Sequence, residues 1–252
     1  MILDMKFKPL LFVVALAAFS CAPKQWVITG SQTAAIPIDS TTQALADQQM
    51  IDFITPVKQN LDKEMNQVIA HTAEEMRAGK PESLLSNWSA DVYLYAASEF
   101  LKSPVDMAVV NMGSLRALLP KGDITVGNIF QLMPFENELV VLWLRGKDVK
   151  RLLDIFAAEG GQGVAGVRMQ IKDGKAVNCT IQGKPIDDET LYSIATNDFL
   201  AGGNDRMIPL ASPVKRVDPG LKIRNILMEY VIRETHEGRK IQSKLDGRIT
   251  VL

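Results

Sequence analysis

Histidine and cysteine are scarce in this chain, whose 252 residues include two of each. Dinuclear hydrolytic metal centres are built from clusters of histidine, aspartate and asparagine side chains. His71 and His236 lie far apart in the sequence, and neither has a second histidine nearby. We therefore expect both to be ordinary surface or partly buried residues, and we expect no catalytic metal site and no cofactor on this chain.

An excess of positive charge is also absent. The 28 lysines and arginines are balanced by 29 aspartates and glutamates, which gives a net charge of −1 and a pI near 6.2. Proteins that bind polymeric nucleic acid usually carry a basic patch or stripe. The composition therefore argues against polymeric nucleic acid as a partner.

Two common catalytic templates are missing, since the chain has neither a Gly-x-Ser-x-Gly elbow nor a Gly-Lys-Ser/Thr phosphate loop. Residues 161–166 do match Gly-x-Gly-x-x-Gly. A dinucleotide fingerprint follows a strand and opens a helix, whereas this run follows the helical pattern of 149–156 and precedes the alternating stretch of 167–171. The order is reversed, so we predict a helix stop and a loop.

The N-terminus has the features of a bacterial export signal. Lys6 and Lys8 precede an apolar run over 10–19, which is too short for a stable membrane span but suits a signal peptide over 1–20. The run ends Ala-Phe-Ser-Cys, which resembles a lipobox and predicts lipidation of Cys21. The alternative is simple cleavage nearby, with Cys21 incidental. Either way, the location expected is the bacterial cell envelope, and with a lipid anchor the protein would be membrane-tethered and periplasmic or surface-facing.

The remaining cysteine and the next segment agree with that reading. If Cys21 carries lipid, Cys179 has no disulfide partner, and we expect it to be buried as a small apolar residue. Residues 21–45 are rich in Ser, Thr, Gln and Ala with little apolar periodicity, which is typical of a tether. Residues 46–252 then form one domain, a size that can bury a substantial core without disulfides.

Apolar periodicity predicts helices over 57–77, 87–101, 147–158 and 221–234, and strands over 105–111, 138–144, 167–172, 176–182 and 190–196. His71 falls within the first predicted helix. Helices and strands intermix without strict alternation. The fold class expected is therefore α+β, a single domain with a mixed β-sheet flanked by helices.

Three short segments carry the chemistry of a possible binding site: residues 111–116 (Asn-Met-Gly-Ser-Leu-Arg), 134–137 (Pro-Phe-Glu-Asn) and 196–205 (Thr-Asn-Asp-Phe-Leu-Ala-Gly-Gly-Asn-Asp). A guanidinium fork suits a phosphate or carboxylate. Aromatic rings stack on flat heterocycles, and a carboxylate accepts hydrogen bonds from two neighbouring hydroxyls. Taken singly, each residue has a simpler reading, because phenylalanines are usually core, arginines usually surface and an aspartate after two glycines usually a turn.

Together and in this order, the segments resemble the C-terminal, substrate-binding domain of the 5′-nucleotidase family, whose motifs read Asn-x-Gly-Gly-x-Arg, Gly-x-Ile-Thr, Pro-Phe-x-Asn and Thr-Asn-Asp-Phe-Leu-Ala-x-Gly-Gly-Asp. Residues 122–125 (Gly-Asp-Ile-Thr) supply the second motif. The resemblance covers roughly residues 50–252, including 81–91 and the closing 246–249. It implies that two phenylalanines hold a base, that an aspartate holds ribose hydroxyls, and that an asparagine and an arginine lie near a phosphate. The substrate-binding residues it implies are Asn111, Arg116, Phe135, Asn197, Phe199, Gly203 and Asp205.

The chain departs from the family pattern at three places. Ser114 replaces the second glycine of the first motif, and the last motif ends Gly-Gly-Asn-Asp instead of Gly-Gly-Asp. An arginine expected just before Glu82 is absent, with Lys80 and Pro81 in its place. Contact with the phosphate is therefore the part of the resemblance that these departures touch most.

Three functions from different classes remain open. The first is the nucleoside- or 5′-nucleotide-binding half of a split 5′-nucleotidase, acting in nucleotide catabolism with a separate metallophosphoesterase that carries the divalent metals. The second is a lipoprotein that captures nucleosides or nucleotides for uptake without hydrolysis. The third is a structural or interaction protein whose site has drifted out of use.

Overall fold

The computed structural model describes residues 26–252. The described residues divide into two units, one that ends at Ile51 and a second at Asp52–Leu252. In the described part of the first unit, residues 26–38 have no regular secondary structure, and a short 3-10 helix, η1, follows at Ser40–Leu45. The second unit holds all seven candidate substrate-binding residues.

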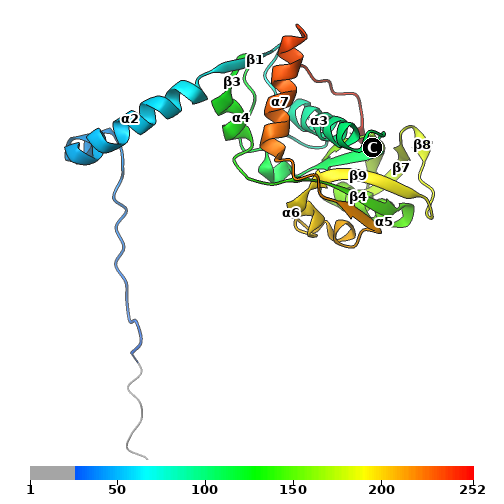
Figure 1. The fold of residues 1–252 in the computed structure, drawn as a ribbon. Coiled ribbons are helices and arrows are strands. Elements are labelled where there is room, and N and C mark those ends of the chain that lie inside the picture. Colours follow the sequence, from blue (N-terminus) through cyan, green and yellow to red (C-terminus); the bar gives the residue numbers. More distant parts are fainter. Residues whose placement is uncertain (1–25) are drawn as a thin grey trace, which may run out of the picture. The chain divides into compact units, whose positions relative to one another are not determined.

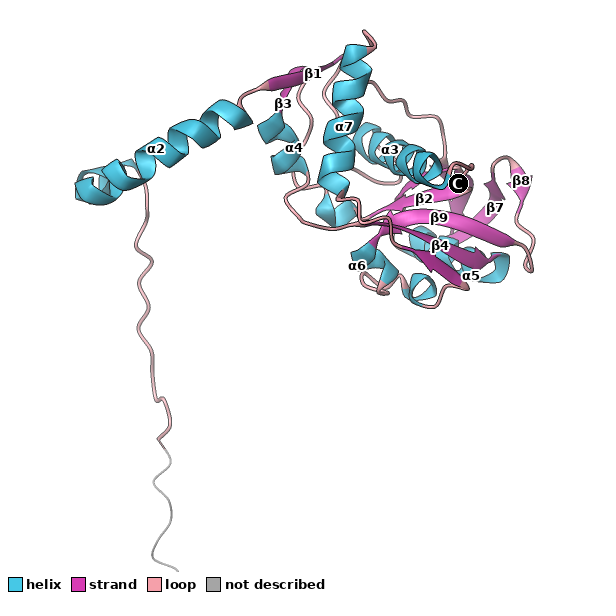
Figure 2. Ribbon diagram, in the orientation of Figure 1, coloured by secondary structure: helices cyan, strands magenta, loops and turns pink. Residues whose placement is uncertain are grey.

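Helices and strands alternate irregularly along the chain, as Figures 1 and 2 show. The helices are α2 (Gln48–Met65), α3 (Leu84–Leu101), α4 (Val126–Leu132), α5 (Gly146–Ala158), α6 (Asp198–Ala201) and α7 (Ile223–His236), with 3-10 turns η2 (Met112–Ser114) and η3 (Ile208–Ala211). The strands are β1 (Val68–Thr72), β2 (Met107–Val110), β3 (Gly122–Thr125), β4 (Leu139–Arg145), β5 (Gly163–Ala165), β6 (Val167–Lys172), β7 (Lys175–Ile181), β8 (Lys184–Pro185), β9 (Leu191–Asn197), β10 (Lys215–Val217) and β11 (Ile249–Val251).

A five-stranded sheet in the order β10-β4-β9-β2-β5 forms the centre of the domain. Strands β2 and β9 are parallel, and the other neighbouring pairs are antiparallel. The central strands read Met-Ala-Val-Val and Leu-Val-Val-Leu-Trp-Leu, nearly continuous apolar runs typical of strands covered on both faces. The sheet is therefore mixed and buried, as the strand patterns predict.

Successive residues of these strands enter two different cores because side chains alternate along a strand. In β2, Ala108 and Val110 pack with α3 and α7, whereas Met107 and Val109 pack with α5. Figure 1 shows α3 and α7 on one side of β4 and β9, and α5 and α6 on the other. The arrangement leaves the ends of the strands and the loops between them free to form a site.

Two smaller sheets complete the unit. Strands β11, β6, β7 and β8 form one of them, with β11 and β6 parallel, and β1 pairs with β3 in the other. Cys179 lies in β7, partly buried against the core on the α5 side, where burial raises the pKa of its thiol. The α+β class with a mixed sheet flanked by helices is thus confirmed.

The helix predicted over 57–77 is wrong in its second half. Helix α2 ends at Met65, and β1 begins at Val68 and pairs with β3. A bulge in β1 turns the neighbouring residues Ile69 and Ala70 both inward, which imitates a helical pattern in the sequence. His71 is consequently an exposed strand residue, and its Nδ1 lies 3.2 Å from an Asp123 carboxylate oxygen.

The loop predicted at residues 161–166 is partly wrong. Helix α5 does end at Ala158, as predicted, but Gly163–Ala165 is strand β5, at the edge of the sheet beside β2. Gly161 itself has φ +126, and a Cβ there would lie 2.3 Å from the carbonyl oxygen of Pro81. A glycine is needed at this position because two loops meet backbone to backbone.

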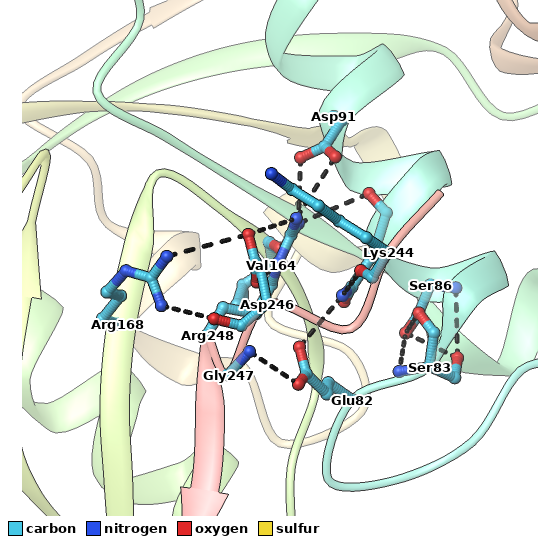
Figure 3. Close-up of polar contacts among 11 residues, drawn as sticks. Glu82, Ser83, Ser86, Asp91, Val164, Arg168, Lys244, Asp246, Gly247 and Arg248 are labelled. Carbon is cyan, nitrogen blue, oxygen red and sulfur yellow. Dashed lines mark hydrogen bonds and ion pairs between the residues drawn. The ribbon is translucent and has the colours of Figure 1, made fainter. Parts of the chain in front are cut away.

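The closing segment of the chain is fastened by a nearly buried arginine, Arg248, whose surroundings appear in Figure 3. Its guanidinium donates to the carboxylates of Asp91 in α3 and Asp246, and to the carbonyl oxygen of Val164 in β5 at 2.7 Å. Nearby, the Gly247 amide donates to the Glu82 carboxylate. The sequence motifs at 81–91 and 246–249 therefore meet in space as a structural joint.

Two sequence predictions lie outside the described residues, namely the signal peptide over 1–20 and lipidation at Cys21. Within residues 26–252, no helix is both long and apolar enough to cross a membrane. The domain boundary at residue 46 likewise stays a prediction.

Candidate functional site

Three loops that are distant in sequence line one open pocket of about 580 Å³. The first loop follows β2, the second follows α4, and the third follows β9. Five of the seven residues proposed from the sequence motifs lie in its wall. The lining residues are Asn111, Gly113, Ser114, Arg116, Phe135, Glu136, Asn137, Phe199 and Asp205.

The first loop is a tight turn at the end of β2, ordered by its own side chains. The Asn111 carboxamide oxygen accepts a hydrogen bond from the Gly113 amide at 2.9 Å, which caps η2. Ser114, the departure from the glycine of the family motif, is buried and donates its hydroxyl to the Asn111 carbonyl oxygen at 2.6 Å. The serine therefore fits by strengthening the turn.

The second loop presents Phe135 at the pocket wall. Its ring is 38% exposed, which excludes a core role. The Arg116 guanidinium carbon lies 5.3 Å from the ring centroid, within cation–π range. Glu136, the next residue, also lines the pocket, and a hydrogen bond and the positive charge of Arg224 lower the pKa of its carboxyl.

The third loop presents Phe199 and Asp205. Phe199 lies in the single turn of α6 and is 40% exposed. Asp205 adopts φ +52, a left-handed conformation that is uncommon outside glycine and is found most often with aspartate and asparagine. The additional Asn204 donates its side-chain N–H to the Phe199 carbonyl oxygen at 2.8 Å. The loop is one residue longer than the family motif, and the additional residue ties it to the backbone of Phe199.

Asn197 and Gly203 do not line the pocket: Asn197 lies at the end of β9, just before the third loop, and Gly203 lies within that loop. Asn197 is buried at the end of β9, where its side-chain oxygen caps α6 by accepting from the Leu200 amide at 2.9 Å. Gly203 has φ +82, and a Cβ there would lie 3.1 Å from the Ala211 Cβ. Their positions support the loop, and a direct ligand contact by either one stays a prediction.

The second and third loops are joined directly. The Asn137 side-chain amide donates to the Asp198 carboxylate at 2.8 Å, and the Asp198 amide donates to the Glu138 carbonyl oxygen at 2.9 Å. The same Asp198 oxygen accepts from the Phe199 amide. The two phenylalanines are therefore carried by loops that share hydrogen bonds, so the separation of their backbones is fixed.

A smaller hollow of about 270 Å³ continues from the pocket past Asn111, Gly113 and Asp205 toward the glycine loop. Lys80 lines it, and its ammonium donates to the Glu159 carbonyl oxygen at 2.6 Å. Arg206 ion-pairs with the Glu159 carboxylate at 2.9 Å. Two further cations thus lie beside the pocket. Lys80 stands where the family pattern has an arginine, whereas Arg206 could not be recognised because it follows the last motif.

Within residues 26–252, no three His, Cys, Asp or Glu side chains are grouped so that they could hold a metal ion. The pocket instead offers two exposed rings, the guanidinium of Arg116 and two carboxylates, of which Glu136 is paired with Arg224 and Asp205 is not. This set can accept a ligand with a flat heterocycle, an anionic group and neighbouring hydroxyls.

Comparison with known families identifies the class of protein. Residues 37–212 match the model of the 5′-nucleotidase C-terminal domain. The chain therefore belongs to the 5′-nucleotidase family through this domain, which confirms the resemblance read from the motifs.

The relatives are considerably longer proteins. The trifunctional nucleotide phosphoesterase YfkN of Bacillus subtilis is 29% identical over 87% of this chain and 16% of its own length. UshA of Escherichia coli is 26% identical over 76% of this chain and 36% of its own. The crystal structure of a Thermus thermophilus 5′-nucleotidase precursor superposes with a TM-score of 0.67 at 29% identity, over 81% of this chain and 42% of that one. The chain thus spans less than half of each relative.

Proposed function

We propose that this protein is the substrate-binding half of a split 5′-nucleotidase-type phosphohydrolase in nucleotide catabolism, and that it binds nucleosides and nucleoside 5′-monophosphates. The observation that carries the proposal is the convergence of Phe135, Phe199, Arg116 and Asp205 on one pocket. The two rings take the base, the carboxylate takes the ribose hydroxyls, and the guanidinium and Asn111 take the phosphate.

The hydrolytic step then belongs to a separate metallophosphoesterase that carries the divalent metals. Such a partner would use metal-activated water, while this chain fixes the base and ribose and so places the phosphate. Docking of two polypeptides can replace a covalent linker if the local concentration is high. A lipid anchor at Cys21 in the bacterial envelope would supply part of that concentration by confining this half to a membrane surface.

The direct test is calorimetry with adenosine and AMP, followed by turnover measurements. Binding of both ligands is expected, with no AMP hydrolysis by the purified chain in Mn²⁺ or Zn²⁺. Adding a purified metallophosphoesterase domain from the same cells should then increase AMP hydrolysis. Absence of binding to either ligand would overturn the proposal.

The same experiment separates the alternative function. Adenosine binding with no stimulation of any phosphoesterase would favour a lipoprotein that captures nucleosides for uptake. For the anchor, radioactive palmitate should label the wild type and not Cys21→Ser. An unmodified N-terminus at another residue would exclude lipidation.

A further inference from the structure

The loop that carries Phe135 is held from behind by a residue of helix α7. Arg224 is 9% exposed and does not belong to the pocket wall. Its guanidinium donates to the carbonyl oxygens of Met133 at 3.4 Å and Pro134 at 3.3 Å, and it also pairs with the Glu136 carboxylate. The partners of this one side chain therefore flank Phe135 on both sides in the sequence.

The guanidinium is itself fixed in place. Its carbon lies 4.3 Å from the centroid of the Phe130 ring in α4, so the planar group lies between an aromatic face and the loop. A guanidinium suits such a site because it stacks on a ring and donates along its edge at the same time. A lysine offers one compact charge and no flat face, and it cannot reproduce both contacts.

The residues beside Arg224 bind the same loop. The Lys222 ammonium donates to the Glu136 carbonyl oxygen at 3.1 Å, and the Ile223 amide donates to the Asn137 carbonyl oxygen at 2.9 Å. Farther along, the Leu139 amide donates to the Leu221 carbonyl oxygen at 2.8 Å. Donors at the start of α7 thus take the place of water around this loop. The loop is already ordered before a ligand binds, so binding costs less conformational entropy.

We infer that Arg224 is a positioning residue that fixes the Phe135 ring in the pocket wall and thereby sets affinity for the heterocyclic part of the ligand without contacting it. Loss of the guanidinium would leave the carbonyl groups of Met133 and Pro134 without this donor. The loop would then move so that these groups could accept hydrogen bonds from water. For its ligand, the inference rests on the proposed function. For the order of the loop, it rests on the hydrogen bonds alone.

The first experiment needs no ligand. Backbone order parameters of residues 133–138 are measured by ¹⁵N relaxation in the wild type, in Arg224→Met and in Arg233→Met. Arg233 is a matched control because it lies in the same helix and its guanidinium carbon lies 4.0 Å from the centroid of the Tyr95 ring, away from the loop. Arg224→Met should lower the order parameters from about 0.85 to below about 0.6 in this loop alone. Unchanged values would overturn the inference.

The second experiment uses a double-mutant cycle with adenosine and ribose 5-phosphate. Arg224→Met should weaken adenosine by about fivefold to thirtyfold and change ribose 5-phosphate by less than about twofold. In a Phe135→Ala background the same change should cause no further loss of affinity for adenosine. Arg224→Lys should recover only part of the affinity. A merely structural role predicts instead an equal loss in both backgrounds and for both ligands.

The two experiments separate the possible failures. If the wild type binds neither ligand, the proposed function is wrong, and the order parameters still decide whether Arg224 positions the loop. If the wild type binds adenosine and the cycle is additive, the nucleoside-binding part of the proposed function stands and the inference falls.

Discussion

The side chains of Arg224 and Arg248 are 11% and 7% exposed, and each donates to two backbone carbonyl groups while pairing with carboxylates. Their partners are distributed differently. Those of Arg248 come from α3, from β5 and from the closing segment, whereas those of Arg224 in hydrogen bonds and ion pairs are all in residues 133–136.

This difference assigns Arg248 to the stability of the whole domain and Arg224 to the shape of the binding site. A guanidinium that joins segments distant in sequence must release all of them when it is lost, so its removal should act on unfolding of the whole domain. Removal of a guanidinium that binds a single loop should act mainly on the local shape of that loop, because the rest of the core keeps its contacts. The comparison therefore predicts two different responses to the same substitution.

The largest effect is expected for Arg248→Met. The change leaves Asp246 and Asp91 without their shared cation and removes a donor from the Val164 carbonyl oxygen. Chemical denaturation should show a loss of about 2–4 kcal/mol in the free energy of unfolding, since a nearly buried guanidinium is removed from two partly exposed carboxylates and a buried carbonyl group. Adenosine affinity should not change while the protein is folded.

Arg168→Met is the matched control, because Arg168 also contacts Asp246 but its side chain is 57% exposed. Its cost should stay below about 1 kcal/mol. Equal losses for the two variants would remove the distinction between a buried joint and a surface pair.

A smaller effect, on binding instead of folding, is expected for Phe199→Ala. Base stacking contributes about 1–3 kcal/mol, so adenosine should bind roughly tenfold to hundredfold more weakly. The melting temperature should change little because the ring is 40% exposed. Phe100, which is 44% exposed and lies outside the pocket, supplies the control. A large drop in melting temperature with unchanged affinity of the folded protein would end the case for a stacked base.

The residues of the pocket wall could be predicted from the sequence better than the residues that hold the wall in place. Segments 105–111 and 138–144 were recognisable because β2 and β4 are apolar on both faces, and segment 190–196 because β9 has a short apolar stretch around Ile194 and Ala195. The wall residues were recognisable because their motifs are local. Strand β1 was missed because its bulge hides the alternation, and its partner β3 lies far along the chain.

Arg224 gave no signal at all. At the start of an amphipathic helix, an arginine has the appearance of an ordinary surface residue. Its role depends on contacts with Pro134 and Glu136, which are separated from it by 90 and 88 positions in the sequence. Such pairings follow from the packing of α7 beside α4, and no periodicity in the sequence encodes them.

A more selective effect is expected at Asp205. Asn is the substitution to use, because it tolerates the left-handed backbone at this position and alanine does not. Loss of the carboxylate should weaken adenosine by about tenfold, as hydrogen bonds to a charged group contribute about 1.5–3 kcal/mol. The affinity of 2′,3′-dideoxyadenosine should change by less than about twofold in calorimetry. Equal losses for the two ligands would mean that Asp205 does not bind the ribose hydroxyls.

The smallest effect concerns the pH dependence of the Phe135 loop. The hydrogen bond and the charge of Arg224 lower the pKa of the Glu136 carboxyl below its usual range, so the contact favours the ionised form. A group with a lowered pKa in the folded state stabilises above the ordinary glutamate pKa of about 4.3 and loses that contribution as the pH falls through the folded value. The order parameter of the Phe135 amide should therefore be constant from pH 7 to about pH 5 and decrease below about pH 4. Glu136→Gln should remove this dependence and leave the signals of α3 unaffected. If the variant shows the same decrease, the acid sensitivity belongs to another carboxylate, and the link between Arg224 and Glu136 contributes nothing to the position of the ring.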